Sequence, residues 1–253
     1  MKKNNLWKYI QIGTDLRFLQ DTDENHAVFG EAGIVGNIER ILKEMDDLGL
    51  SVTITSSYKL KEFQKKLLSE KVKTGRQLSS EECKELRDIL SYIRHTMTAE
   101  AQGKFAFVTT DKRYDVIKLL DDMAGVFAPN IYESLPEMAK FDFSESGKCI
   151  VFERPTAAAF HILRGTEVVV RIYYKKFLRR KSEGKTWGQL LGELKNKNTG
   201  KKPNIITLNH LVNIKDSFRN PTQHPDKTYD IQEVQDLLSV CLDVVNRMIS
   251  EMK

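Results

Sequence analysis

The sequence predicts a mainly α-helical protein made of two domains, the second of which is a four-helix bundle. Its 253 residues are more than one minimal domain needs. Apolar residues recur at the 3.6-residue spacing of amphipathic helices along most of the chain. Only two segments, 52–57 and 104–109, have the composition of strands, so the sequence allows at most a small two-stranded ribbon.

The amino-terminal part opens with three predicted helices. Apolar residues share one face over 34–48 and again over 60–68. The third helix begins at a capping box, because Ser79 and Glu82 have the spacing that satisfies the free amide groups of a first turn, and its apolar stripe runs to Met97.

A connection separates these helices from the second domain. A short apolar pattern over 116–123 continues the helical region, and the Gly, Pro and Asn residues of 125–136 then predict a linker. We therefore place the domain boundary near Lys140. This gives a helical amino-terminal domain over 1–140 and a bundle over 141–253.

Four amphipathic helices are predicted in the bundle. Pro155 fits the first turn of a helix that runs to about Arg180, since proline has no amide proton to lose there. Helices over 187–194 and 205–218 follow, and Asp230 caps the last one, which continues to the carboxy terminus. Amphipathic helices joined by short connections predict an up-and-down bundle.

Glu167 is out of place in the first of these helices. It shares an apolar face with Phe160, Leu163 and Val170. An ionised carboxylate in such a stripe costs free energy unless it is paired. We therefore expect a basic or donor-rich partner for Glu167 from across the bundle.

The composition indicates an ordered protein and excludes several classes of site. Apolar residues make up 40% and charged residues 30% of the chain. No apolar run is long enough for a signal peptide or a membrane span, so we expect a cytoplasmic protein.

The three cysteines and the remaining histidines are too scattered for a disulfide framework or a metal site, and with no Gly-rich phosphate loop we expect no cofactor. These residues are Cys83, Cys149, Cys241, His26, His95 and His210.

Charge is divided unevenly along the chain. Residues 1–150 carry 22 Lys and Arg against 24 Asp and Glu, whereas the remainder carries 18 against 11. Eleven basic residues lie between Arg171 and Lys202, a pattern that suits a polyanion but also a solvated helix end. Four of them are our candidates for contact with that polyanion, Lys175, Lys176, Arg179 and Arg180, although charge alone cannot separate RNA from DNA or lipid.

The segment before the last helix contains the residues best suited to phosphoryl chemistry. Arg219 supplies a permanent forked cation for phosphate oxygens, and His224 can exchange protons near neutral pH. Pro221 and Pro225 are expected to end regular helix and to restrict the backbone between them. The spacing alone also fits a helix end whose basic groups complement the helix dipole.

In this context Arg219-Asn220 and His224 resemble the Arg-x(4–6)-His signature of the HEPN superfamily. The helix that contains Ala157 to Glu167 is similar to the opening helix of bacterial members, and the resemblance covers roughly residues 142–253. It implies a homodimer or higher homo-oligomer, cleavage of RNA without a metal ion, and frequent use in toxin–antitoxin or anti-phage systems with a cognate partner.

The resemblance also implies roles for individual residues. His224 would act as general acid or base, Arg219 would stabilise charge on the phosphorus, and Asn220 would orient one of them or cap the helix. His161, Arg164 and Glu167 would be supporting residues, with a structural role favoured. Some members place a tyrosine two residues after the histidine as a site of modification, but the nearest tyrosine here is Tyr229.

Two other functions stay open at the level of sequence. The bundle could bind nucleotide or RNA as a catalytically silent sensor, or it could be an oligomerising adaptor. Neutralising the basic residues 175–180 would weaken RNA binding in a nuclease or a sensor and leave an adaptor unaffected.

Overall fold

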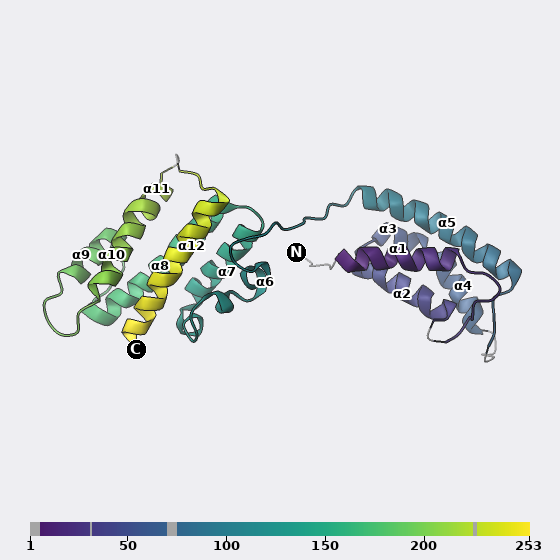
Figure 1. Ribbon diagram of the computed structural model, residues 1–253, viewed down its shortest axis with the longest axis horizontal. Coiled ribbons are helices and arrows are strands. Elements are labelled where there is room, and N and C mark those ends of the chain that lie inside the picture. The colour runs from purple at the N-terminus through teal and green to yellow at the C-terminus, as the bar shows by residue number, and fades with distance from the viewer. Residues whose placement is uncertain (1–5, 31, 70–74, 225–226) are drawn as a thin grey trace. The chain divides into compact units, whose positions relative to one another are not determined.

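The computed structural model describes residues 6–30, 32–69, 75–224 and 227–253 and confirms the mainly α-helical fold class (Figure 1). The chain forms two compact units, Met1–Phe107 and Val108–Lys253. Each unit has its own hydrophobic core. None of the described helices is both long and apolar enough to cross a membrane.

The first unit consists of five helices around one core. They are α1 (Leu6–Gln20), α2 (Ile34–Asp47), α3 (Ser51–Ser56), α4 (Tyr58–Ser69) and α5 (Ser80–Gln102). α1 packs against α2 and α5, and α3 and α4 each contact both α2 and α5. The apolar faces expected over 34–48, 60–68 and 79–97 supply most of the buried residues.

The capping box is confirmed, whereas the two segments that could have formed a ribbon, 52–57 and 104–109, contain no strand. Ser79 accepts a hydrogen bond from the Glu82 amide, and the Glu82 carboxylate accepts one from the Ser79 amide. Residues 52–57 lie in or just after α3, whose first turn is held by Glu100: its Oε2 accepts hydrogen bonds from the Thr53 amide at 2.8 Å and hydroxyl at 2.7 Å. This tertiary contact outweighs the strand preference of the segment. Residues 104–109 have no regular structure.

The second unit begins earlier in the chain than the sequence predicts. It opens with α6 (Val116–Asp121), two short 3₁₀ turns and α7 (Glu137–Val151). The expected linker is part of the core, because Phe127, Ile131 and Leu135 are buried in it. The boundary near Lys140 would cut through α7, and the two units divide at Phe107 instead.

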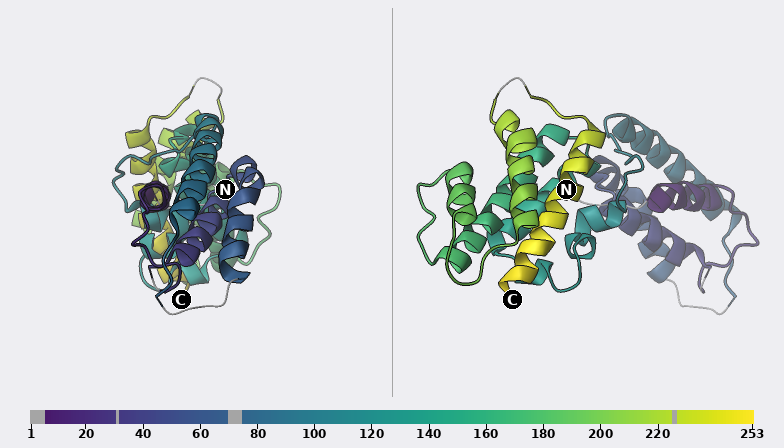
Figure 2. Two further views of the ribbon diagram at one scale, coloured as in Figure 1. Left: turned by 90° about the vertical axis from the view of Figure 1, so that its right-hand side faces the viewer. Right: turned by 60° about the vertical axis from the view of Figure 1, so that its left-hand side comes forward.

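The remaining helices of the second unit match the predicted order. They are α8 (Pro155–Leu178), α9 (Trp187–Lys195), α10 (Ile205–Ile214) and α12 (Ile231–Met252), with short segments between the last two. α8 packs against α7, α9 and α12, while α10 packs against α9 and α12 (Figures 1 and 2). The bundle therefore contains the four predicted helices and α7, which the sequence reading missed. Capping boxes start α9 at Thr186 and α12 at Asp230.

Candidate active site

A π-helical segment places Arg219 at the edge of the bundle. α10 continues into a π turn over Lys215–Arg219 and then into the short helix α11 (Asn220–Thr222). Single π turns inside helices are frequent at functional sites. Pro221 does not end the helix as expected, because it lies in the first turn of α11, where a missing amide proton costs nothing. Pro225 and Asp226 lie outside the described residues.

Glu167 has the basic partners that its position demands. It lies on α8 and forms an ion pair with Arg171 one turn later, with Nη2 to Oε1 at 2.5 Å. Its other oxygen, Oε2, lies 3.7 Å from Arg219 Nη2 across the bundle. That distance is too long for a hydrogen bond, so no N–H of the Arg219 guanidinium is hydrogen-bonded to a described residue. Arg219 is thus oriented by charge while its donors remain available.

His224 is more accessible than Arg219. It is exposed and follows α11, and its amide donates to the Pro221 carbonyl at 3.0 Å. Among the described residues none hydrogen-bonds the imidazole ring. Asn220 orients neither Arg219 nor His224 in the described part of the chain, because its side-chain amide donates to Asp216 Oδ1 at 3.4 Å.

Tyr229 anchors the segment that contains His224. Its hydroxyl lies 2.7 Å from the Thr222 hydroxyl, and its amide donates to the Thr156 hydroxyl at the start of α8 at 3.1 Å. Burial raises the pKa of Tyr229 above its ordinary value. Thr222 and Tyr229, which lie on either side of His224 in the chain, are therefore bound to each other. In the sequence, this tyrosine was notable only because it lies outside the position of the modified tyrosine in some HEPN members.

His161 and Arg164 converge on a residue that the sequence reading missed. Asp142 of α7 is fully buried, and its Oδ1 lies 2.9 Å from His161 Nδ1. Arg164 donates from Nε to Oδ2 at 2.8 Å and from Nη2 to Oδ1 at 2.5 Å. The cluster ties α7 to α8, in line with the structural role expected for His161 and Arg164. No sequence signal singled out Asp142, because α7 itself was not predicted.

The four candidate RNA-binding residues lie at the end of α8. Lys175, Arg179 and Arg180, together with Lys181 and Glu183, line an open hollow of about 500 Å³. Lys176 is exposed but is not part of this lining. Arg179 ends α8 in the left-handed conformation, with φ of 52°, which is uncommon for a residue other than glycine.

Acidic residues neutralise part of this basic region. Lys175 pairs with Glu183 at 2.8 Å, and Arg180 lies 3.6 Å from Glu193. Lys185 also binds Glu193, and these contacts lower the pKa of both acidic residues. Arg171 is occupied as well, because it donates to the carbonyls of residues 182 and 185. The charge available to a polyanion is therefore smaller than the sequence count suggests.

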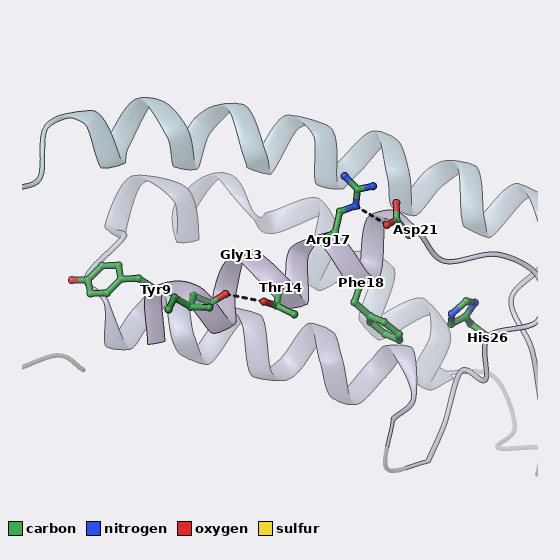
Figure 3. A pocket seen from close by; sticks show the side chains of 8 residues that line it. Tyr9, Gly13, Thr14, Arg17, Phe18, Asp21 and His26 are labelled. Carbon is green, nitrogen blue, oxygen red and sulfur yellow. Dashed lines mark hydrogen bonds and ion pairs between the residues drawn. The ribbon is translucent and has the colours of Figure 1, made fainter. Parts of the chain in front are cut away.

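The first unit has an open hollow along α1, with a volume of about 680 Å³ (Figure 3). Several of its polar groups already have local partners. Arg17 binds Asp21 at 2.6 Å, and the Thr14 hydroxyl donates to the Ile10 carbonyl at 3.0 Å. Few groups are left to converge on a ligand, and we do not place a site there.

The cysteines have the character of apolar residues. Cys83 and Cys241 are buried and Cys149 is partly buried, all with free thiols. Burial raises the pKa of all three, and that of Cys241 to about 12. Within the described ranges, no group of three or more His, Cys, Asp or Glu side chains is placed to hold a metal ion.

Comparisons with protein-family models, with curated proteins and with solved structures find no match for this chain.

Proposed function

We propose that the second unit is a metal-independent endoribonuclease of the HEPN type, acting as a homodimer in a toxin–antitoxin or anti-phage setting. The observation that carries the proposal is the state of Arg219: it is held by Glu167 at 3.7 Å, and none of its donors is hydrogen-bonded to a described residue. A guanidinium that is oriented but not saturated can bind phosphate oxygens in a bidentate manner. His224, five residues later, is exposed and can exchange protons.

The reaction would be an internal transfer at phosphorus. The ribose 2′-hydroxyl loses its proton and attacks the adjacent phosphorus, the bond to O5′ breaks, and the leaving oxygen takes up a proton. The products are a 2′,3′-cyclic phosphate and a 5′-hydroxyl. His224 would transfer one of these protons, and Arg219 would stabilise the charge that grows on the non-bridging oxygens.

Loss of either Arg219 or His224 should slow the cleavage of RNA. Arg219→Ala should reduce cleavage of total RNA and tRNA in EDTA by roughly 10²–10³-fold, and His224→Ala by roughly 10²–10⁴-fold. Product amounts on denaturing gels give the rates. All proteins are first compared by thermal melting and by mass in solution.

Matched controls come from the same unit. His210 and Arg247 both bind Asp243 at the surface, the first at 3.1 Å and the second at 2.9 Å. His210→Ala and Arg247→Ala should cleave like the unmodified chain. Equal cleavage by all five proteins would indicate another site or a contaminant, and absence of cleavage by the unmodified chain under these conditions would count against the nuclease and favour a silent sensor.

A further inference from the structure

One side of α8 presents an exposed aromatic ring, Phe160, one turn from the guanidinium group of Arg164. Phe160, Arg164 and Glu167 follow one another at positions i, i+4 and i+7, so they lie along one side of the helix. Glu167 in turn holds Arg219 from across the bundle at 3.7 Å. Phe160 therefore lies about one turn from Arg164 and two turns from the carboxylate that orients Arg219.

Phe160 is accessible although its sequence pattern predicts burial. Its side chain is 48% exposed, whereas Leu163 and Val170 of the same predicted stripe are buried. Phe141 of α7 is 53% exposed as well, and its ring meets the edge of His161 at 6.3 Å between centroids. One accessible ring, Phe160, thus lies one turn from Arg164, and a second, Phe141, lies beside His161, in a unit whose core takes up most of its other aromatic side chains.

Arg164 is held in place by hydrogen bonds that do not occupy all of its donors. Its Nε and Nη2 donate to the fully buried Asp142, while Nη1 makes no hydrogen bond to a described residue. The side chain is still 57% exposed. Because Asp142 holds one edge of the guanidinium, the other edge is presented to solvent with little freedom left to lose on binding.

We propose that Phe160 and Arg164 form a nucleotide subsite for single-stranded RNA beside the Arg219 centre. A base stacks on the Phe160 ring, and the phosphate of the same or the adjacent nucleotide binds the free edge of Arg164. Exposed aromatic rings interleaved with fixed cations are the usual means of binding unpaired nucleotides. The subsite rests on the proposed nuclease, for which it positions the strand whose phosphate reaches Arg219.

The test is a binding measurement in which the RNA stays intact. Every protein contains His224→Ala, and the probes are a short fluorescent oligouridylate and an RNA duplex of the same length. Phe160→Leu should weaken binding of the oligouridylate by roughly tenfold, the loss of one base–aromatic stack, and Phe160→Trp should retain it. Duplex binding should not change, because paired bases cannot stack on the ring. Phe105→Leu, which alters an exposed ring of the first unit, is the matched control.

Arg164 gives a second, independent readout. Arg164→Gln should weaken oligouridylate binding and reduce the slope of log affinity against log salt by about 0.7, the value for one phosphate contact on a single strand. Compared with Arg164→Gln, Arg164→Lys should recover the salt slope more fully than the oligouridylate affinity. Lysine keeps the positive charge but lacks the planar, forked guanidinium group. Thermal melting shows whether each variant is folded.

Several outcomes overturn the subsite. The first is an unchanged oligouridylate affinity in Phe160→Leu, and the second is an equal loss of duplex affinity in that variant. The third is that the parent protein does not bind the oligouridylate. The fourth is a lower mass of Phe160→Leu in solution, which would show that the ring is a contact between copies of the chain. Failure of the subsite can be told from failure of the nuclease. If binding depends on Phe160 but the unmodified chain does not cleave RNA, the subsite is retained and the nuclease is overturned. If the unmodified chain cleaves RNA but Phe160→Leu binds the oligouridylate unchanged, the nuclease is retained and the subsite is overturned.

Discussion

Two arginines of the second unit meet carboxylates in contrasting ways. Arg164 donates two short hydrogen bonds to Asp142, which is fully buried. Arg219 lies 3.7 Å from Glu167, a half-buried carboxylate that it shares with Arg171. The first pair joins two helices, while the second leaves an arginine ready for another anion. The difference teaches that burial of the carboxylate decides how firmly its arginine is held: Asp142 fixes one edge of Arg164 and leaves the other edge exposed, whereas Glu167 orients Arg219 without a hydrogen bond.

The largest effect should follow from removing the buried carboxylate. Asp142→Ala leaves Arg164 and His161 without their acceptor and opens a gap between α7 and α8. We expect the free energy of unfolding of the second unit to fall by about 2–3 kcal/mol, the scale of hydrogen bonds to a charged group, measured by urea denaturation. Asp236→Ala, which removes an exposed carboxylate bound to Arg113, should cost less than about 1 kcal/mol. Similar losses of unfolding free energy in Asp142→Ala and Asp236→Ala would contradict the view that the buried carboxylate contributes more to stability.

Glu167→Gln should separate activity from stability. The pairs of Glu167 are partly exposed, so its loss should cost no more than about 1 kcal/mol. Cleavage should nevertheless fall by about tenfold, because Arg219 loses the charge that orients it. Single-turnover rates at saturating RNA measure this effect. Full activity in Glu167→Gln would mean that Arg219 is positioned without Glu167.

Tyr229→Phe tests the anchor of the segment that contains His224. The variant removes the hydroxyl that meets Thr222 and keeps the ring in the core. We expect a loss of about 1 kcal/mol in stability, the scale of one hydrogen bond, together with faster amide exchange around residues 222–224. Thr222→Val should have a similar effect, and the double variant should lose less than the sum. Additive losses would show that the two hydroxyl groups act independently.

The smallest effect on stability should come from Glu44, a carboxylate of the first unit. Glu44 is buried, its Oε2 lacks a hydrogen bond within the described structure, and desolvation followed by the charge of Asp15 raises its pKa. A raised folded-state pKa means that stability is highest below the ordinary value of 4.5 and is lost as pH rises through the folded pKa. Glu44→Gln should therefore stabilise the chain by about 1 kcal/mol at pH 7 and by almost nothing at pH 4. Thermal melts at the two pH values measure the difference, and an equal shift at both would exclude titration of Glu44 as its cause.

Local sequence determined the helices with strong periodicity and clear ends. The capping boxes at Ser79 and Asp230 and the apolar stripe of α12 depend on neighbours within one or two turns, so they were predictable. The demand of Glu167 for a basic partner was predictable in the same way, since it follows from one charge on an apolar face.

Only the tertiary structure decided which residues meet at the candidate site. It paired Glu167 with Arg219, brought Asp142 to His161 and Arg164, left Phe160 exposed and turned residues 51–56 into a helix capped by Glu100. Each of these outcomes depends on how the helices pack against one another. The periodicity of one helix gives the direction of a side chain, but the partner that it reaches is set by the packing of the whole bundle.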